Sequence, residues 1–245
     1  MDDTPNYTTC YIAFLDLLGF KKIIKSKQCE EIVQIFSDIK KRKLQNVYVN
    51  VNGKCETLID HDSIQEVKLK IMSDSICFYV HALIPHAFFL LLAICGTFQF
   101  AMAKREEPVL MRGGIVLGEL YAEGDITFGP GLTDAYLLEE QSAKTPRIII
   151  SKETLEEAKS RIDKGFLGYI NEFTHLDEDG YYIIDYLSIF FRNPEKPNAP
   201  VDFYKHIIAV LERETDPSII GKYLYLKKRI ETIFAEFYYK GFYEN

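Results

Sequence analysis

Residues 11–20, with the sequence Tyr-Ile-Ala-Phe-Leu-Asp-Leu-Leu-Gly-Phe, are apolar over most of their length, as a strand buried on both faces should be. Asp16 interrupts this run, and Gly19 follows three residues later. Burying a carboxylate at a strand end is costly without a partner, and a metal ion is a natural partner. A glycine turn lets the next backbone amides approach a phosphate closely. We therefore expect a strand that ends in a metal and phosphate site.

A second stretch, residues 67–80, has the sequence Val-Lys-Leu-Lys-Ile-Met-Ser-Asp-Ser-Ile-Cys-Phe-Tyr-Val. Its apolar residues alternate on either side of a polar Ser-Asp-Ser tip, which predicts a β-hairpin with Asp74 in the turn. If this hairpin pairs beside the first strand, Asp16 and Asp74 lie together. Two such close carboxylates repel each other unless a cation lies between them. The pair therefore predicts a two-metal site of the kind used for phosphoryl transfer.

Four motifs occur in order along the chain: Phe-Leu-Asp-Leu-Leu-Gly-Phe (14–20), Lys-Ile-Met-Ser-Asp-Ser (70–75), Arg-Gly-Gly-Ile-Val-Leu-Gly (112–118) and Phe-Gly-Pro-Gly-Leu-Thr-Asp-Ala (128–135). Together they resemble the catalytic domain of class III nucleotidyl cyclases. The closest resemblance is to the short, stand-alone bacterial cyclases of the Pycsar anti-phage system, which make cyclic UMP or cyclic CMP. The resemblance implies an α+β, ferredoxin-like (palm-type) sandwich, a homodimer with interfacial active sites, and a separate effector that senses the cyclic nucleotide after phage infection.

The resemblance also implies roles for individual residues. Asp16 and Asp74 match the two metal-binding aspartates, and Leu17 stands where the family offers a backbone carbonyl to the second ion. Hard oxygen ligands suit Mg²⁺ or Mn²⁺. Gly19 and Phe20 would lead into the helix whose amides hold the phosphates, although Phe20 could equally pack in the core. Either aspartate alone would more often be a cap or a surface charge; their joint occurrence favours the metal site.

Base recognition is expected to differ from that of purine cyclases. Lys70 stands where those enzymes carry a base-contacting lysine, and its even offset from Asp74 places both side chains on one face of a strand. The partner aspartate would fall near Ile126, which cannot accept a hydrogen bond. The broken pair favours UTP or CTP, and Phe14 could stack on or enclose a smaller pyrimidine. A solvent-exposed edge lysine and a core phenylalanine are the alternative interpretations.

Two positions depart from the family pattern. Thr133 replaces the ribose-orienting asparagine, and Leu137 replaces the transition-state arginine, whose charge a leucine cannot supply. Lys144, Arg147 or Arg112 could provide that cation, from the same or a partner subunit, although a structural ion pair is the favoured role for Arg112. These losses leave a second hypothesis, a degenerate cyclase-like domain that binds a nucleotide and regulates a partner. A palm-type polymerase or diguanylate cyclase is a third, opposed by the lack of a Gly-Gly-Glu/Asp-Glu-Phe tip.

Composition sets the remaining expectations. The net charge of −7 over 245 residues argues against nucleic-acid binding but permits a metal-bound nucleotide. The five cysteines have no metal-ligand spacing, and no secretory signal is visible at the N-terminus, so we expect free thiols and a cytoplasmic protein. Residues 86–103 are almost entirely apolar, and we expect a buried core helix there rather than a membrane span.

Periodicity predicts the other elements. We expect a catalytic domain over residues 8–192, followed by a linker and C-terminal helices over 193–245 that pack on it or across the dimer. Residues 46–66 are expected to be a loop or irregular hairpin, and 181–191 a final strand or strand pair. Further helices are expected over 30–43, 85–104, 132–143, 152–161, 202–212 and 217–239, and strands over 109–121 and 147–151.

Overall fold

In the computed structural model of the chain, the described residues are 5–43, 47–51, 54–59, 61–103, 105, 107–162, 164–191 and 199–239. Strands β4, β5, β1 and β6 lie side by side in that order, and each pair of neighbours is antiparallel. The chain leaves β1 through α1 and α2 and leaves β5 through α4, which gives the ferredoxin-like β-α-β-β-α-β order. The predicted α+β fold is confirmed. The bounds of these elements are β1 Thr8–Leu17, α1 Phe20–Ser26, α2 Cys29–Lys43, β4 Lys68–Met72, β5 Ser75–His81, α4 Ala87–Ala103 and β6 Met111–Glu123.

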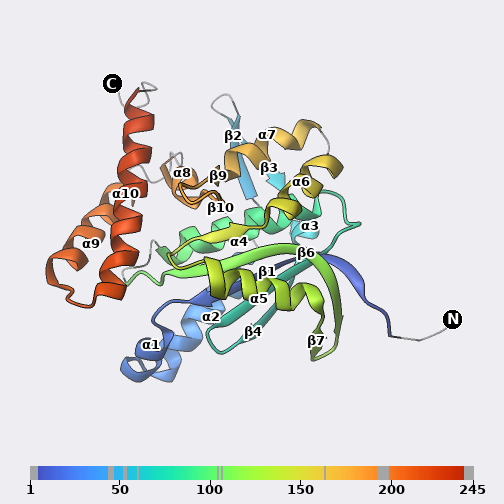
Figure 1. Cartoon of the computed structure of the whole chain (residues 1–245), viewed down its shortest axis with the longest axis horizontal. Coiled ribbons are helices and arrows are strands. Elements are labelled where there is room, and N and C mark those ends of the chain that lie inside the picture. Colours follow the sequence, from blue (N-terminus) through green and yellow to red (C-terminus); the bar gives the residue numbers. More distant parts are fainter. Residues whose placement is uncertain are drawn as a thin grey trace.

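The sheet continues beyond β6 (Figure 1). Strand β8 lies parallel to β6, and β10 and β9 follow it, while the short β7 folds back on the far end of β6. Helices α6 and α7 connect β8 to β9, and the pair α9 and α10 lies at one end of the molecule. The bounds are β7 Ile126–Phe128, α5 Pro130–Ser142, β8 Ile148–Ile150, α6 Lys152–Arg161, α7 Lys164–Phe173, β9 Thr174–Leu176, β10 Tyr182–Ile184, α8 Tyr186–Phe191, α9 Ala199–Arg213 and α10 Pro217–Tyr239.

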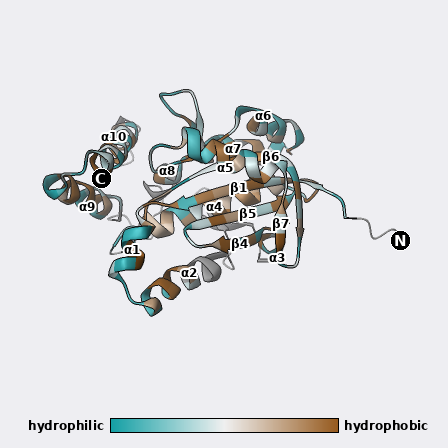
Figure 2. Cartoon of the chain, turned by 60° about the horizontal axis from the view of Figure 1, so that its bottom comes forward, coloured by the Kyte–Doolittle hydropathy of each residue, from teal (hydrophilic) through white to brown (hydrophobic). Residues whose placement is uncertain are grey.

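The two faces of β1 enter different apolar clusters. Tyr11, Ala13 and Leu15 face the larger cluster, which contains α4, while Ile12 and Phe14 face a smaller one beneath α5. This alternation follows from the two-residue period of a strand. Hydrophobic colouring concentrates in the central strands, whereas α6 is largely hydrophilic (Figure 2). Asp16 follows Ile12 and Phe14 on the same face of β1, because successive residues of a strand alternate between its faces. The Asp16 carboxylate is therefore on the side of the sheet that α5 covers.

Helix α4 is buried on nearly all sides, which confirms the expected core helix. In the described part of the chain, no helix combines the length and the hydropathy needed to cross a membrane. Four cysteines, Cys10, Cys29, Cys77 and Cys95, have free thiols, as the sequence predicts.

Helix α5 crosses β6 unusually closely because glycines line the contact. A Cβ atom on Gly114 would lie 2.5 Å from the carbonyl oxygen of Ala135, and one on Gly118 would lie 2.6 Å from Cα of Gly131. Both distances are shorter than side chains tolerate, so the helix can lie this close only over glycine. The close approach brings the buried face of α5 directly onto the strand that carries Arg112.

One expectation about secondary structure needs correction. The predicted strand over 181–191 is a short strand, β10, followed by helix α8, because the Asp185 side chain accepts hydrogen bonds from Ser188 and caps a helix at that point. Of the two alternatives for residues 46–66, the structure has the irregular hairpin, formed by β2 Val47–Val51 and β3 Lys54–Ile59 with a register shift at Val47 and Tyr48. The short helix α3 His61–Gln65, α7 and β9 were not expected.

The C-terminal helices contact the rest of the chain through buried polar pairs. Arg229 on α10 forms an ion pair with Asp185 at 2.7 Å, and the hydroxyl of Tyr225 donates to Asp177 at 2.8 Å. Leu226 and Ile230, which belong to α10 itself, are fully buried on its inner face. Most of the expected linker, residues 193–200, lies outside the described residues, so its structure remains a prediction.

Candidate active site

The two predicted metal-binding aspartates lie at the same end of the central strands. Asp16 is opposite Ser75 of β5 and opposite Arg112 of β6, and Asp74 is in the turn that precedes Ser75. The backbone N–H of Leu17 donates to the carbonyl of Asp74 at 3.0 Å, which ties the two segments together. Both aspartates are partly exposed. The strand register therefore brings together two acids that are 58 residues apart in the sequence.

Arg112 connects this edge to α5. Its Nε atom donates to Oδ2 of Asp16 at 3.2 Å and lies 2.6 Å from Oε1 of Glu139, and its Nη1 donates to the carbonyl of Ala143 at 3.3 Å. One guanidinium is thus shared by two carboxylates. The arrangement agrees with the structural ion pair favoured for Arg112 from the sequence, and it also places a cation beside the expected metal site.

Glu139 is the least exposed carboxylate of this group. Its side chain is 3% exposed, whereas those of Asp16 and Arg112 are 22% and 23% exposed. Burial raises the pKa of Glu139 to about 7; the Arg112 guanidinium opposes the rise, and the negative charge of Asp16 adds to it. At neutral pH this carboxyl group is poised between its charged and neutral forms.

The segment after β1 has the geometry expected of an amide-rich turn. Gly19 adopts a left-handed conformation with φ of +76°, and α1 begins at Phe20. The first N–H groups of any helix have no partner within that helix. The Phe20 side chain is buried and packs edge-on against Phe36, so the core-packing interpretation is correct for its ring. A contribution of this turn to phosphate binding would come from its backbone.

The proposed base-reading positions also lie close together. The ammonium of Lys70 donates to the carbonyl of Gly124, in the turn between β6 and β7. Ile126 follows in β7 with 61% of its side chain exposed. This hydrogen bond places Lys70 beside the turn that precedes Ile126. Ile126 is the position where the family resemblance leads us to expect an aspartate partner for the lysine.

Phe14 packs against the residues of α5. Phe14 is 9% exposed, and its ring packs edge-on against Tyr136 at 5.5 Å, so it belongs to the smaller apolar cluster. Tyr136 is the exposed member of the pair. Thr133 and Leu137 are also exposed on α5, and the Thr133 hydroxyl donates to the carbonyl of Gly129 at 3.4 Å.

The other two candidate cations lie outside this group. Lys144 is exposed and donates to the carbonyl of Glu140. Arg147 is buried, forms ion pairs with Asp177 at 2.5 Å and with Asp179, and lies over the ring of Tyr225. Two carboxylates satisfy its charge, so this geometry opposes a role for Arg147 in stabilising a substrate. Arg112 is the candidate that contacts a predicted metal ligand.

The donor set suits a hard divalent cation. Asp16 and Asp74 offer carboxylate oxygens at one edge, and the backbone of Leu17 adjoins both. Within the described residues, no group of three or more Asp, Glu, His or Cys side chains converges tightly enough to hold an ion on protein ligands alone. Two carboxylates with open positions fit Mg²⁺ or Mn²⁺, which commonly keep water and substrate phosphate oxygens as ligands.

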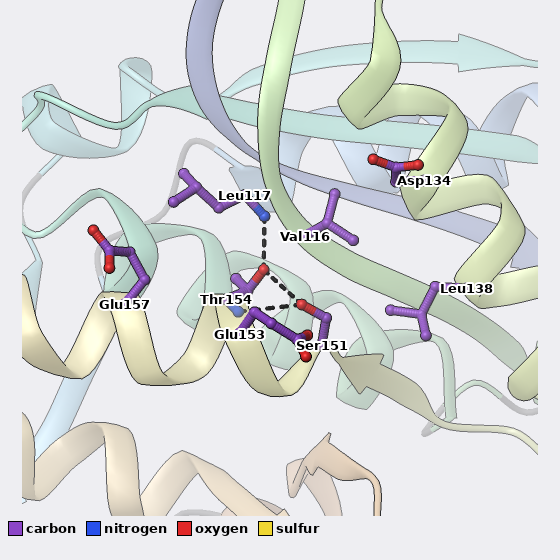
Figure 3. A pocket seen from close by; sticks show the side chains of 8 residues that line it. All are labelled: Val116, Leu117, Asp134, Leu138, Ser151, Glu153, Thr154 and Glu157. Carbon is purple, nitrogen blue, oxygen red and sulfur yellow. Dashed lines mark hydrogen bonds between the residues drawn. The ribbon is translucent and has the colours of Figure 1, made fainter.

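A separate pocket of about 550 Å³ lies between α5, α6 and β6 (Figure 3). Asp134 enters it from α5, and Glu153 and Glu157 enter it from α6. The Thr154 hydroxyl in its floor accepts a hydrogen bond from the backbone N–H of Leu117 at 2.7 Å. None of the predicted site residues lines this pocket, so it is distinct from the aspartate edge.

Glu139 and Tyr136 are the site residues that sequence reasoning missed as functional groups. A signal for Glu139 was present, because Gly131, Ala135 and Glu139 follow one another at four-residue spacing on the buried face of α5. An acid on an otherwise small and apolar stripe requires a buried cationic partner. Arg112 is that partner.

No family model matches the chain, and no curated protein matches it. Solved structures that resemble it include the adenylyl cyclase CyaB from P. aeruginosa, with 14% identity, a TM-score of 0.45, and coverage of 74% of this chain and 96% of that one. A rhodopsin-guanylyl cyclase catalytic core has 12% identity, a TM-score of 0.47, and coverage of 73% and 96%. An adenylate/guanylate cyclase/hydrolase from Silicibacter pomeroyi has 20% identity, a TM-score of 0.41, and coverage of 66% and 86%. With such identities and TM-scores, these likenesses carry no argument about activity.

Proposed function

We propose that this protein is a nucleotidyl cyclase that converts a nucleoside triphosphate, UTP or CTP, into its 3′,5′-cyclic monophosphate and pyrophosphate. The observation that supports it most strongly is the convergence of Asp16 and Asp74 at one end of a ferredoxin-like sheet, joined through the Leu17–Asp74 backbone hydrogen bond. The order of the four motifs, and their resemblance to class III cyclases, adds independent support.

The chain's own groups fit the reaction. Asp16 and Asp74 would hold Mn²⁺ or Mg²⁺, with the Leu17 carbonyl as a further ligand. Bound divalent ions supply Lewis acidity that favours ionisation of the ribose 3′-hydroxyl and neutralises the triphosphate. We propose that the first amides of α1, which begins directly after the left-handed Gly19, contact the phosphates. Arg112 supplies a fixed positive charge beside the phosphates, where charge develops during phosphoryl transfer.

Base selection is proposed to favour pyrimidines. Lys70 reaches the turn that precedes Ile126, and an exposed aliphatic side chain replaces the acceptor that would complete a purine-reading pair. The Phe14–Tyr136 pair forms an aromatic surface on the same face as Asp16. We propose that Thr133 lies near the ribose. A homodimer in which α5 of one subunit completes the site of the other would explain why Thr133 and Leu137 are exposed.

The proposed biological role follows from the resemblance to Pycsar cyclases. The cyclic nucleotide would act as a second messenger in anti-phage defence and would be sensed by a separate effector. Expression of the chain with its neighbouring genes during phage challenge tests this role independently of the chemistry.

The activity is tested by incubating the purified chain with ATP, GTP, CTP or UTP and Mn²⁺ or Mg²⁺, followed by mass analysis of the products. We expect a cyclic monophosphate from UTP or CTP, and a loss of at least about 100-fold in turnover in Asp74→Asn and Asp16→Asn. Glu156→Gln is the matched control, because it removes an equivalent charge from an exposed position on α6.

Each result separates the hypotheses. A product from all four nucleotides would refute pyrimidine selectivity but retain the cyclase. Nucleotide binding without a product, under conditions where the variants and the wild type behave alike, would refute the cyclase and favour the regulatory nucleotide-binding domain. Linear condensation products would instead indicate a polymerase, and a cyclic dinucleotide would indicate a diguanylate cyclase.

A further inference from the structure

The position of Glu139 poses a physical problem. It is an ionisable side chain on the face of α5 that packs against β6, at a helix–strand contact otherwise made of glycine and alanine. A neutral or apolar residue would cost less there, since burying a carboxylate carries a desolvation penalty. Costly charges of this kind gather at functional sites. The group that Glu139 contacts, Arg112, is the one that also contacts Asp16.

The distances show how the charge is shared. Arg112 lies 2.6 Å from Glu139 and 3.2 Å from Asp16, so its guanidinium is within ion-pair distance of both acids, and the buried acid is the nearer one. Two carboxylates and one guanidinium leave this group with a net negative charge when all three are ionised. Without a charge at Glu139, the Arg112–Asp16 pair would be neutral, and Asp16 would attract a divalent cation less strongly.

We propose that Glu139 is a positioning residue for the metal-binding edge: it engages the Arg112 guanidinium from the buried side, so that Asp16 keeps its negative charge available for a divalent cation. This inference rests on the proposed function, because it takes Asp16 as a metal ligand. Glu139 itself touches neither metal nor substrate. It acts through Arg112, whose third contact, to the Ala143 carbonyl, fixes the guanidinium at the end of α5.

The proposal is tested by titrating the full-length chain with Mn²⁺ alone and measuring bound and free ion by electron paramagnetic resonance. Glu139→Gln keeps the shape of the side chain and removes its charge. We expect it to weaken Mn²⁺ binding by about three- to tenfold, which is the effect of losing one neighbouring negative charge near a partly exposed site. Glu140→Gln, which removes an exposed charge one residue away, should change binding by less than about twofold.

A double-mutant cycle distinguishes this role from a structural one. In an Arg112→Gln background, Glu139→Gln should no longer weaken Mn²⁺ binding, because a carboxyl group buried without a cationic partner takes its neutral form, as glutamine does. Arg112→Lys keeps the positive charge and should preserve the effect. Far-UV circular dichroism confirms that each variant is folded. If Glu139→Gln weakens binding equally with and without Arg112, or does not weaken it at all, the proposal is overturned.

The failure of the proposed function gives a different pattern. If the wild type and Asp16→Asn bind Mn²⁺ equally, the aspartate edge is not a metal site, and the function and this inference both fail. If Asp16→Asn abolishes binding while Glu139→Gln binds like the wild type, the proposed function stands and only the role of Glu139 is refuted.

Discussion

Replacing Glu139 with glutamine should make the protein more stable at alkaline pH. In the fold its pKa is about 7, raised by burial from an ordinary value of 4.5. The folded state therefore binds this proton more tightly than the unfolded state does. The stabilisation from the protonated carboxyl is fully present below about pH 4.5, declines as the pH rises towards 7, and is absent above it. Glutamine cannot ionise, so the variant avoids this loss.

The size of the effect follows from the pKa change. A rise of this extent corresponds to about 3 kcal/mol as an upper limit. The protein relaxes around a buried charge, and water reaches the neighbouring sheet edge, so the desolvation penalty is smaller than this limit and we expect roughly 1–2 kcal/mol. The free energy of unfolding of Glu139→Gln should exceed that of the wild type by this amount at pH 8 and match it near pH 4.5.

Urea unfolding in metal-free buffer, followed by far-UV circular dichroism, measures this difference; the chain has no tryptophan for a fluorescence assay. Other titrating groups cancel in the comparison between the two proteins. Glu156→Gln, which removes an exposed carboxylate from α6, is the matched control. A Glu139→Gln protein that is less stable than the wild type at pH 8 but not at pH 4.5 would show that the Arg112 ion pair outweighs desolvation, and the reasoning would fail.

Three further predictions test the fold and the site. Gly118→Ala should lower the free energy of unfolding by about 2–3 kcal/mol, since its Cβ would lie 2.6 Å from Cα of Gly131; thermal unfolding checks this, and an unchanged melting temperature would contradict the close α5–β6 contact. Arg147→Met should destabilise the fold by about 3 kcal/mol, because it leaves two carboxylates without their cation. Mn²⁺ binding should stay within about twofold of the wild type, and a large loss of metal binding would show that Arg147 belongs to the site. Ile126→Asp should provide a hydrogen-bond acceptor near Lys70 and raise the ratio of ATP to UTP turnover by about tenfold or more. Competition between the two nucleotides measures this ratio, and an unchanged ratio would refute the proposed base-reading position.

The sequence predicts the central fold well because its signals there are local and strong. The alternation around Asp16 and Asp74 sets the strands and their faces, and the long apolar run gives α4. It fails between the predicted helices at 152–161 and 202–212, where Tyr181 to Phe191 is apolar apart from Asp185 and Ser188 and could form either a strand or a helix. The deciding event is the cap made by Asp185, whose side chain hydrogen-bonds to Ser188 and is also paired with Arg229, more than forty residues later. Pattern alone cannot foresee that partner.

The candidate site divides in the same way. The two aspartates follow from motif and register, but the partner of each arginine depends on tertiary contacts. Arg112 and Arg147 look equivalent in the sequence as possible cations. In the fold, Arg147 forms ion pairs with Asp177 and Asp179. Arg112 instead forms one ion pair with the buried Glu139 and one with Asp16 at the exposed sheet edge.

This difference supports the proposal that the chemistry takes place at the Arg112 edge. Arg147 and Arg229 each have side chains 7% exposed and pair with carboxylates that are buried or bound within the same network, so their charges act on the fold. Arg112 is 23% exposed and shares its charge with Asp16, which is 22% exposed. An ion approaching Asp16 from solvent therefore competes with Arg112 directly, and the strength of that competition is set by Glu139 behind it. If Asp16 binds a divalent cation as proposed, the affinity of this edge would be adjusted from the protein interior, by a residue that the ion does not contact.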